Sequence, residues 1–345
     1  MSTQPVSLAM VGFGNVGKAF ARLLLRKAAL IEHDHGVTFQ VTGIATAHHG
    51  TAINAQGIDL AQALDLAGRG AGLGSLSVQS SGSSVADFVD NCPAQILLEN
   101  SPVNHLTGQP AIETITEALR RRMHVVTANK GPVVHGYAQL NALAQQHHVR
   151  FLFESAVMDG APIFSLFRNC LPVSELHGFT GVLNSCTNYI LGLMEQGQSF
   201  EEAVRSAQTI GIAETDPSGD IDGWDAAIKV AALCTVLMGI PLRPQDLSRE
   251  GIRGLTPEDI AQARSAGERW KLVCSAKRVG DRVETSVRPQ RVPAGSPLYS
   301  VEGTSSFVQF ETDTLPGLGI LESNPSPDTT AFGLLSDVLT LVGKG

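Results

Sequence analysis

A glycine-rich turn close to the N-terminus constrains the fold more than any other feature of this chain. Residues 12–17 read Gly-Phe-Gly-Asn-Val-Gly, after an apolar segment predicted to be a strand (residues 6–11) and before a segment predicted to be a helix (residues 18–27). In a strand–turn–helix unit, such glycines allow a tight turn, a close approach of the backbone to a pyrophosphate, and close packing of helix on strand. The pyrophosphate would bind the free N–H groups of the helix N-terminus. The sequence therefore predicts a dinucleotide-binding, Rossmann-type doubly wound parallel sheet of the α/β class.

The end of the second predicted strand bears on the choice of dinucleotide. Residues 38–45 form this strand, and residues 46–50 continue with Thr-Ala-His-His-Gly. An acidic residue here usually binds the ribose 2′-hydroxyl of NAD, and its absence removes repulsion of a 2′-phosphate. His48 or His49 could face adenine or phosphate, although two exposed loop histidines are an equally good interpretation. The pattern slightly favours NADP and leaves use of NAD open.

Two further strands of the predicted sheet end in polar residues. Ser101 follows the apolar strand over residues 95–99, and Lys130 follows the short apolar strand that begins at His124. The carboxyl ends of parallel strands line the ligand crevice of a doubly wound sheet. We therefore expect Ser101 to contact the cofactor, and Lys130 is a candidate active-site residue rather than a plain surface lysine.

An acidic segment, residues 211–229, carries five carboxylates and ends in Lys229. The carboxylates are Glu214, Asp216, Asp220, Asp222 and Asp225. A helix predicted from residue 223 onward places Asp225 and Lys229 on one face, because residues four apart are neighbours there. Residues 230–238 are apolar on nearly all sides of the helix, so the side chain of Lys229 is expected to extend from a position near the protein interior. A lysine of this kind can donate a proton, and the carboxylates can hold an ammonium or hydroxyl group. A solvated acidic turn with a surface ion pair is the alternative.

The length of 345 residues allows about two domains. We expect a dinucleotide-binding domain over residues 1–150 and a second domain over residues 151–312, in which helices and alternating strands indicate an α+β structure. Residues 313–345 are expected to return to the first domain through a helix over residues 329–342.

Composition narrows the classes of partner. The net charge is −8 without a basic tract, which argues against nucleic acid and anionic membranes. The five cysteines are dispersed and form no C-x-x-C motif, so free thiols in a reducing compartment are expected. No apolar run reaches the length of a membrane span, and the N-terminus has no signal-peptide pattern. These features predict a cytoplasmic protein.

Five segments together, in order and spacing, resemble homoserine dehydrogenase. They are residues 12–17, 126–132, 154–160, 184–190 and 211–229. The similarity covers residues 5–240 well and the remainder loosely; the Thr-Ala-Asn-Lys tip and the acidic block are specific to the family. The resemblance implies NAD(P)-dependent interconversion of aspartate 4-semialdehyde and homoserine, a step of threonine and methionine biosynthesis. It also implies a homodimer built through the second domain, which would be the substrate-binding and dimerisation domain.

The resemblance also implies roles for individual residues. The residues that would line the cofactor are the three glycines Gly12, Gly14 and Gly17 together with Phe13, Asn15, Val16, Ser101, Lys130 and Gly211. The substrate would be held by Glu214, Asp220 and Asp225. Lys229 would donate the proton, with Lys130 close to the hydride-transfer site, so both lysines are expected to converge beside the nicotinamide ring.

A cation site is a further expectation. The irregular turn after residue 153 exposes carbonyl oxygens, which suit a hard cation such as sodium. The resemblance assigns to a monovalent cation (Na+) the main-chain carbonyls of Glu154, Val157, Asp159 and Ala161.

Three segments depart from the family pattern. Ser185 and Cys186 replace the usual Gly-Thr, Gly219 replaces one acid of the loop, and residues 317–328 replace a glycine- and alanine-rich turn before the last helix. A related dehydrogenase for a different small hydroxy acid is therefore an alternative. A non-catalytic nucleotide-binding sensor is another, against which the presence of both lysines argues. Feedback control by a separate regulatory domain after residue 345 is not expected.

Overall fold

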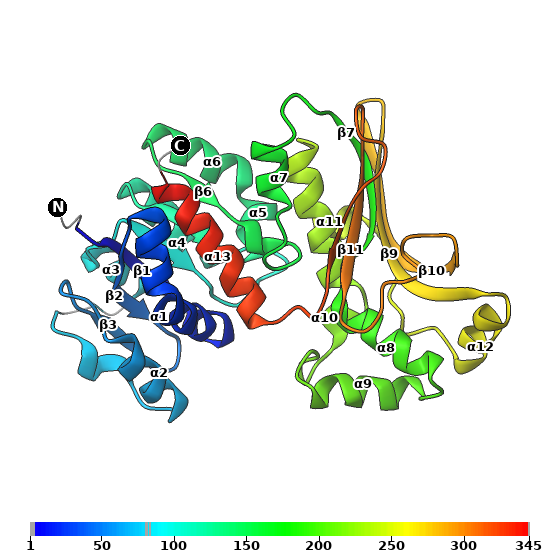
Figure 1. Ribbon diagram of the computed structural model, residues 1–345, viewed down its shortest axis with the longest axis horizontal. Helices are drawn as coiled ribbons and strands as arrows, with labels where there is room; N and C mark the ends of the chain where they lie inside the picture. Colours follow the sequence, from blue (N-terminus) through cyan, green and yellow to red (C-terminus); the bar gives the residue numbers. More distant parts are fainter. Residues whose placement is uncertain (1–3, 80–81, 83, 344–345) are drawn as a thin grey trace. The chain divides into compact units, whose positions relative to one another are not determined.

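The chain forms two compact units (Figure 1). The computed structural model describes residues 4–79, 82 and 84–343. Unit 1 comprises Met1–Pro162 together with Ser326–Gly345, and unit 2 comprises Ile163–Pro325.

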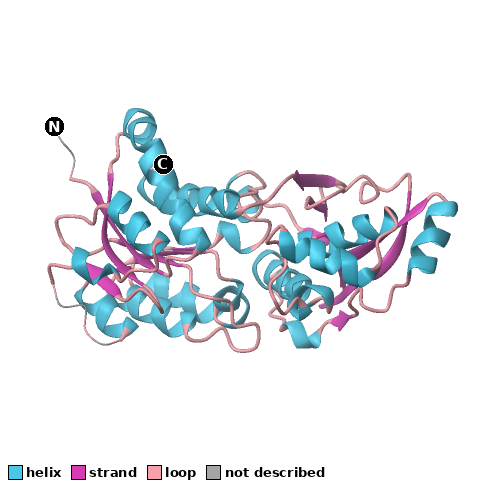
Figure 2. Cartoon of the chain, turned by 90° about the horizontal axis from the view of Figure 1, so that it is seen from below, coloured by secondary structure: helices cyan, strands magenta, loops and turns pink. Residues whose placement is uncertain are grey.

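Unit 1 is built on a six-stranded sheet of the order β3-β2-β1-β4-β5-β6. Its strands are β1 (Val6–Val11), β2 (Phe39–Ala45), β3 (Thr51–Ile53), β4 (Ile96–Glu99), β5 (His124–Thr127) and β6 (Phe151–Leu152). All neighbours are parallel except β3, which is antiparallel to β2. Figure 2 shows helices on both sides of these strands. The predicted doubly wound sheet is confirmed.

The helices of unit 1 follow the strands along the chain. They are α1 (Asn15–His35), α2 (Leu60–Gly68), α3 (Val85–Asn91), α4 (Ala111–Arg120), α5 (Lys130–His135), α6 (Tyr137–Gln146) and α13 (Pro327–Val342), with 3-10 turns η1 (Leu73–Leu76) and η2 (Glu154–Ala156). The inner strand β1 is apolar on both faces, as parallel sheets require, and Leu8 and Met10 are fully buried. Each such side chain contributes roughly 1.5–3 kcal/mol on burial. Leu334 and Val338 of α13 join the same core, as expected for the returning helix.

Unit 2 is built on a second six-stranded sheet, of the order β12-β11-β7-β9-β10-β8. Its strands are β7 (Leu176–Val182), β8 (Ser248–Arg249), β9 (Glu268–Val279), β10 (Arg282–Pro293), β11 (Ser306–Thr312) and β12 (Leu318–Glu322). Neighbours are antiparallel except for the short β8, which is parallel to β10. The second, α+β half is therefore confirmed.

Two helices of unit 2 begin with a capping box. The helices of this unit are α7 (Phe164–Asn169), α8 (Ser185–Glu195), α9 (Phe200–Thr209), α10 (Ser218–Ile221), α11 (Trp224–Leu237) and α12 (Pro257–Ser265), with the 3-10 turn η3 (Pro244–Asp246). Ser199 and Glu202 form a capping box at α9, and Thr256 with Asp259 forms one at α12. Helices α8, α11 and α12 pack on β9.

The chain passes from unit 1 to unit 2 after residue 162 and back to unit 1 after residue 325. From the sequence, these boundaries were expected after residues 150 and 312. Strand β6 belongs to unit 1 because it pairs with β5. Strand β12 belongs to unit 2 because it pairs with β11, so residues 313–325 do not return to unit 1. Within the described residues, no helix has the length and apolarity needed to cross a membrane. All five cysteines are free, and only Cys170 is exposed.

Candidate active site and dinucleotide site

The glycine turn has the geometry of a pyrophosphate-binding turn. Gly12 has φ +96°, and a Cβ on it would overlap the main-chain oxygen of Asn100. A Cβ on Gly17 would lie 2.5 Å from the carbonyl oxygen of Gly12, so the start of α1 packs directly on the turn. A Cβ on Gly14 would have no neighbour within 4 Å. The first and third glycines are therefore required by close packing, and the middle one leaves room for a ligand.

The N-terminus of α1 is suited to an anion. Gly14 precedes it without a capping side chain, and the first turn holds no acidic residue. A helix of 21 residues therefore presents its N–H groups and the positive end of its dipole without internal neutralisation. Asn15 is exposed and Val16 half-buried, whereas Phe13 is only 3% exposed and lies in the core of unit 1. Phe13 can therefore face a cofactor through its backbone, not through its ring.

The ends of β4 and β5 are joined by a polar network. The backbone N–H of Ser101 donates to Oε1 of Glu99 at 2.9 Å, and the Ser101 hydroxyl also bonds to this oxygen. Thr127 donates to the main-chain oxygen of Glu99 at 2.7 Å. The Asn129 amide donates to the main-chain oxygen of Ser101 at 3.2 Å and accepts from the N–H of Gly131 at 3.0 Å, which caps α5. Lys130 is the first residue of α5. Ser101 and the tip that carries Lys130 are thus brought together.

This strand edge also holds an amide that suits a ligand. The side-chain nitrogen and oxygen of Asn100, between Glu99 and Ser101, are buried and form no hydrogen bond within the described part of the chain. Buried amides are normally satisfied, so this one is consistent with a polar ligand at the strand ends. Together with the glycine turn and the uncapped helix, it fits a bound dinucleotide, which would supply the hydride chemistry.

In unit 2, Lys229 lies in a cluster of polar groups. Its Nζ lies 2.8 Å from Oδ2 of Asp225 and donates to the main-chain oxygen of Leu183 at 2.7 Å. The Asn184 amide donates to Oδ1 of Asp220 at 2.7 Å and to Oδ2 of Asp225 at 3.0 Å. The side chains of Lys229 and Asp225 are 14% and 18% exposed, so the ion pair is largely shielded from water. The predicted pair of residues 225 and 229 is present, and Asp220 joins it through Asn184.

Cys186 lies beside this cluster as a neutral thiol. It is buried close to the charge of Asp220. Burial first, and then the charge of Asp220, raise the pKa of this thiol far above its ordinary value. The thiol therefore stays protonated near neutral pH, which argues against a role as a nucleophile.

The other carboxylates of the acidic segment have different surroundings. Glu214 is exposed on the loop before α10, and its side chain forms no hydrogen bond or ion pair with the residues described. Asp216 accepts from the N–H of Ser218 at 3.0 Å. Asp222 forms a two-pronged ion pair with Arg253 at 2.9 and 3.2 Å. Gly211 lies just after α9 with φ +78°, a conformation that favours glycine.

Comparison with known proteins identifies the family. Residues 12–154 match the family model described as homoserine dehydrogenase, NAD binding domain, and residues 162–339 match the homoserine dehydrogenase model. The chain is 34% identical to the NAD(+)-dependent homoserine dehydrogenase of Pseudomonas canavaninivorans over 333 residues, covering 96% of this chain and 95% of that one. It is 35% identical to the homoserine dehydrogenase of Methanocaldococcus jannaschii over 335 residues, covering 97% and 98%.

Solved structures agree. The crystal structure of a putative homoserine dehydrogenase from Archaeoglobus fulgidus superposes with a TM-score of 0.87 at 30% identity, covering 98% of this chain and 100% of that one. A hyperthermophilic archaeal homoserine dehydrogenase in complex with NADPH gives a TM-score of 0.83 at 28% identity and 98% coverage of each chain.

The chain belongs to the homoserine dehydrogenase family.

It is therefore an NAD(P)-dependent oxidoreductase that acts on a CH–OH group. One of the segments that depart from the homoserine dehydrogenase pattern has a regular structure. Residues before the last helix form the edge strand β12, in which Gly319 lies against the ring of Phe307, 2.9 Å from where a Cβ would be. The last helix, α13, then begins with a capping box of Ser326 and Thr329.

The turn assigned to a cation is irregular, as expected. Met158 and Asp159 have φ +54° and +48°, and the N–H of Ala161 donates to the main-chain oxygen of Met158 at 2.9 Å. The hydroxyl of Thr329 in α13 donates to Asp159 Oδ2 at 3.0 Å. In the described residues, no cluster of three or more His, Cys, Asp or Glu side chains forms a metal site. A cation on the main-chain carbonyls of Glu154, Val157, Asp159 and Ala161 stays a prediction.

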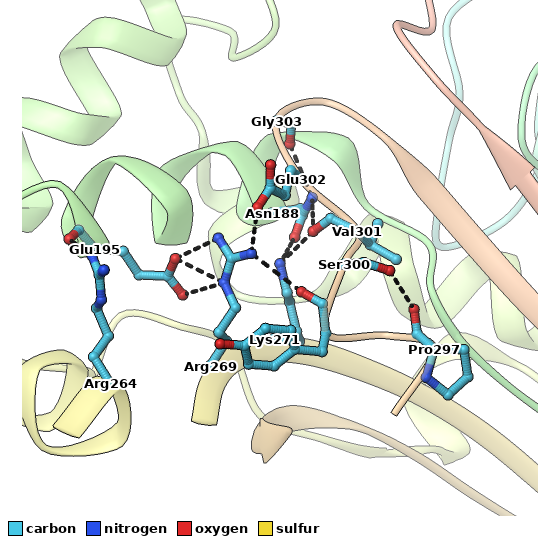
Figure 3. Close-up of polar contacts among 11 residues, drawn as sticks. Asn188, Glu195, Arg264, Arg269, Lys271, Pro297, Ser300, Val301, Glu302 and Gly303 are labelled. Atoms are coloured by element: carbon cyan, nitrogen blue, oxygen red, sulfur yellow. Dashed lines mark hydrogen bonds and ion pairs between the residues drawn. The ribbon is translucent and has the colours of Figure 1, made fainter. Parts of the chain in front are cut away.

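The second asparagine of the segment 184–190 has a structural function (Figure 3). Asn188 donates to the main-chain oxygens of Val301 and Gly303 at 3.2 and 3.0 Å. It accepts from Lys271 Nζ at 2.8 Å, and Lys271 also donates to Val301 at 2.5 Å. Lys271 is 2% exposed, and burial lowers its pKa to about 8. Beside it, Arg269 pairs with Glu195 and Glu302. These groups fasten the loop before β11 to α8 and β9.

Several site residues were not identified from sequence. Asn184 belongs to a segment that resembles the family, but nothing in its spacing indicated that it bonds Asp220 and Asp225. Glu99 and Asn129 flank the predicted Ser101 and Lys130. Glu99 could have been recognised from its position, since it is a carboxylate at the end of an otherwise apolar strand. Carboxylates are rarely buried without partners, so such a residue is a candidate for a polar network.

Proposed function

We propose that this enzyme interconverts L-aspartate 4-semialdehyde and L-homoserine, with Lys229 as the proton donor. The observation that carries the proposal is the shielded cluster around Lys229, in which one ammonium is held by Asp225 and by the main-chain oxygen of Leu183. Hydride delivery to an aldehyde creates negative charge on the carbonyl oxygen, and a fixed ammonium can neutralise and protonate it. In the reverse direction, the same lysine accepts the hydroxyl proton.

The carboxylates of the cluster suit the other end of an amino acid. An ammonium group needs anionic partners where water is excluded. Asp220 and Asp225 are oriented by Asn184, and they are proposed to bind the substrate together with Glu214. Lys130, at the capped start of α5, is proposed to act close to the site of hydride transfer.

Both dinucleotides are proposed to serve, with a preference for NADP. Strand β2 ends at Ala45, and the following turn is held by Thr46, whose hydroxyl accepts from the N–H of His49 at 2.7 Å. This turn supplies no carboxylate, while His48 is exposed beside it. One of the similar proteins is named as NAD(+)-dependent, and another was solved with NADPH.

Three further properties are proposed, of which the dimer and the sodium ion rest on the family resemblance and the location rests on the dispersed free cysteines. They are a homodimer formed through unit 2, a cytoplasmic location, and a sodium ion on the turn after η2. Light scattering of the purified protein measures the first, and the effect of replacing sodium by a larger organic cation on turnover tests the third.

The test of the proposed reaction combines substrate range with one variant. Oxidation of homoserine and of other small hydroxy acids is measured with NAD+ and with NADP+. We expect homoserine to be the best substrate with either cofactor. Lys229→Ala should lower kcat by orders of magnitude and leave the dissociation constant of the reduced cofactor unchanged. Turnover of another hydroxy acid but not of homoserine would assign a different substrate, and an active Lys229→Ala enzyme would remove the role of this lysine.

A further inference from the structure

Glu99 is a buried acid without a cationic partner. It is the last residue of β4 and is 0% exposed, and no lysine, arginine or histidine of the described chain forms an ion pair with it. An ionised carboxylate in such a place is costly unless other groups satisfy it. The groups that surround its side chain are neutral: Ser101, Thr127 and Asn129.

The hydrogen atoms around Glu99 can be counted. Ser101 donates to Oε1 through its N–H and its hydroxyl. The hydroxyl of Thr127 lies 2.7 Å from the main-chain oxygen of Glu99 and 3.0 Å from Oε2, and it accepts from the N–H of Asn129 at 2.9 Å. A hydroxyl carries one hydrogen, so it donates to only one of these two oxygens.

The shorter contact assigns this hydrogen to the main-chain oxygen. Oε2 then faces the oxygen of Thr127 without a hydrogen between them, unless Oε2 carries one itself. A protonated carboxyl satisfies every group: Oε2–H donates to Thr127, Thr127 donates to the main-chain oxygen, and Oε1 accepts from Ser101. Burial also raises the pKa of Glu99, although the hydrogen bonds from Ser101, Thr127 and Asn129 act in the opposite direction.

The network that Glu99 anchors reaches both predicted site residues of this strand edge. On the β4 side it fixes the backbone and the hydroxyl of Ser101. On the β5 side, Thr127 orients Asn129, whose side chain caps α5 at Lys130. The bond from Asn129 to the main-chain oxygen of Ser101 closes the ring.

We propose that Glu99 is a positioning residue of the cofactor site and that it works as a neutral carboxylic acid. In this form it fixes Ser101 and the start of α5 without adding negative charge beside a bound, anionic dinucleotide. The inference rests on the proposed placement of the cofactor at Ser101 and Lys130, but not on the proton-donor role of Lys229.

Two variants and a control separate positioning from general stability. Glu99→Gln keeps one acceptor for Ser101 and one donor for Thr127, whereas Glu99→Ala removes both. Leu97→Ala shortens a buried side chain of the same strand away from its polar end. Binding of the reduced cofactor is measured by fluorescence titration, which requires no turnover and therefore does not depend on the substrate assignment.

We expect Glu99→Gln to bind the cofactor within about threefold of the wild type and Glu99→Ala to bind it at least tenfold more weakly. Leu97→Ala should bind it like the wild type despite lower stability. Glu99→Ala binding that equals the wild type, or a loss in Leu97→Ala as large as in Glu99→Ala, would overturn the positioning role. If Glu99→Ala does not fold, a loss in Glu99→Gln as large as tenfold would overturn it.

The protonation state has its own spectroscopic test. The infrared difference spectrum between the wild type and Glu99→Gln should contain the C=O stretching band of a protonated carboxyl, shifted in deuterium oxide and constant in intensity from pH 6 to pH 9. Carboxylate bands in its place would overturn the neutral form, whatever the binding results.

Discussion

At the scale of single residues, Asn184 connects the parts of the cluster around Lys229. Its amide nitrogen donates to Asp220 and Asp225, and its amide oxygen caps α8 by accepting from the N–H of Thr187 at 2.8 Å. One residue thus orients two proposed substrate carboxylates and starts the helix beside them. Hydrogen bonds to charged groups contribute about 1.5–3 kcal/mol each.

Asn184→Asp separates these two functions. Aspartate keeps the cap on α8 but donates no hydrogen bond, and it adds a third carboxylate to the cluster. We expect kcat/KM for homoserine to fall by about a hundredfold or more, since two bonds are lost and each corresponds to about a tenfold change or more. Steady-state kinetics measure this change, with cofactor binding expected to stay constant.

Asn184→Ala is the matched control for the cap. It loses the cap as well as the two donors, and cap loss costs about 1 kcal/mol. The melting temperature should therefore fall in Asn184→Ala more than in Asn184→Asp, while both lose activity. Full activity in Asn184→Asp would show that Asp220 and Asp225 need no orientation by this amide.

The sequence predicted local contacts between residues and missed distant ones. The spacing of Asp225 and Lys229 was enough to predict that both lie on one face of a helix, where they form an ion pair, because four residues make about one turn. The Asn184–Asp220 contact joins residues 36 apart, for which no periodicity exists. Asp220 and Asp222 look equivalent in the loop, yet Asp222 bonds to Arg253, 31 residues further on. Only the fold distinguishes the two.

At the scale of elements, α13 is fitted closely to the turn after η2. A Cβ on Gly333 would overlap Ser155 Oγ and lie 2.8 Å from the main-chain oxygen of Asp159. Gly333→Ala should therefore push α13 away from this turn. Overpacking of this kind costs about 1–3 kcal/mol, so we expect a lower melting temperature in thermal unfolding experiments.

Gly68→Ala is the matched control. Gly68 ends α2, and a Cβ on it would meet no atom within 4 Å. Alanine is favoured over glycine in a helix, so the melting temperature of the Gly68→Ala protein should stay constant or rise slightly. Equal effects of the two substitutions would show that the contact between α13 and the turn is not tight.

Element boundaries were harder to predict than elements. Helix α1 was expected over residues 18–27 and extends over Asn15–His35. In the acidic segment a helix was expected only from residue 223 onward, but the short α10 precedes it and buries Ile221. Strand β12 was expected to be a turn. It forms because β11 offers it a partner, and a ladder partner cannot be seen in the strand's own residues.

At the scale of the whole molecule, the strands of the two sheets differ in the order of their apolar and polar residues. The parallel sheet of unit 1 has apolar strands without alternation, and the antiparallel strands of unit 2 alternate between apolar and polar residues. The two architectures were predictable for this reason. Their limits were not, because β6 and β12 are assigned to a unit by pairing and not by composition.

Stability should depend on pH through the buried Lys271. Burial lowers the pKa of this lysine from 10.5 to about 8 in the folded protein. Between these values the unfolded chain binds more protons than the folded one, so the free energy of unfolding rises with pH. Below about pH 8 both states carry the charge, and the full cost of burying it is present. As the pH rises from about 8 to 10.5, the loss of this cost raises the free energy of unfolding by about 3 kcal/mol, at 1.36 kcal/mol per pKa unit.

Lys271→Met removes this dependence. Chemical denaturation of wild type and variant between pH 7 and pH 10.5 should give a stability difference that is constant up to about pH 8 and then shifts in favour of the wild type. Lys277→Met removes a charge from an exposed position of the same strand, β9, and its difference from the wild type should stay flat. A flat profile for Lys271→Met as well would mean that Asn188 and Val301 solvate the ammonium as well as water does.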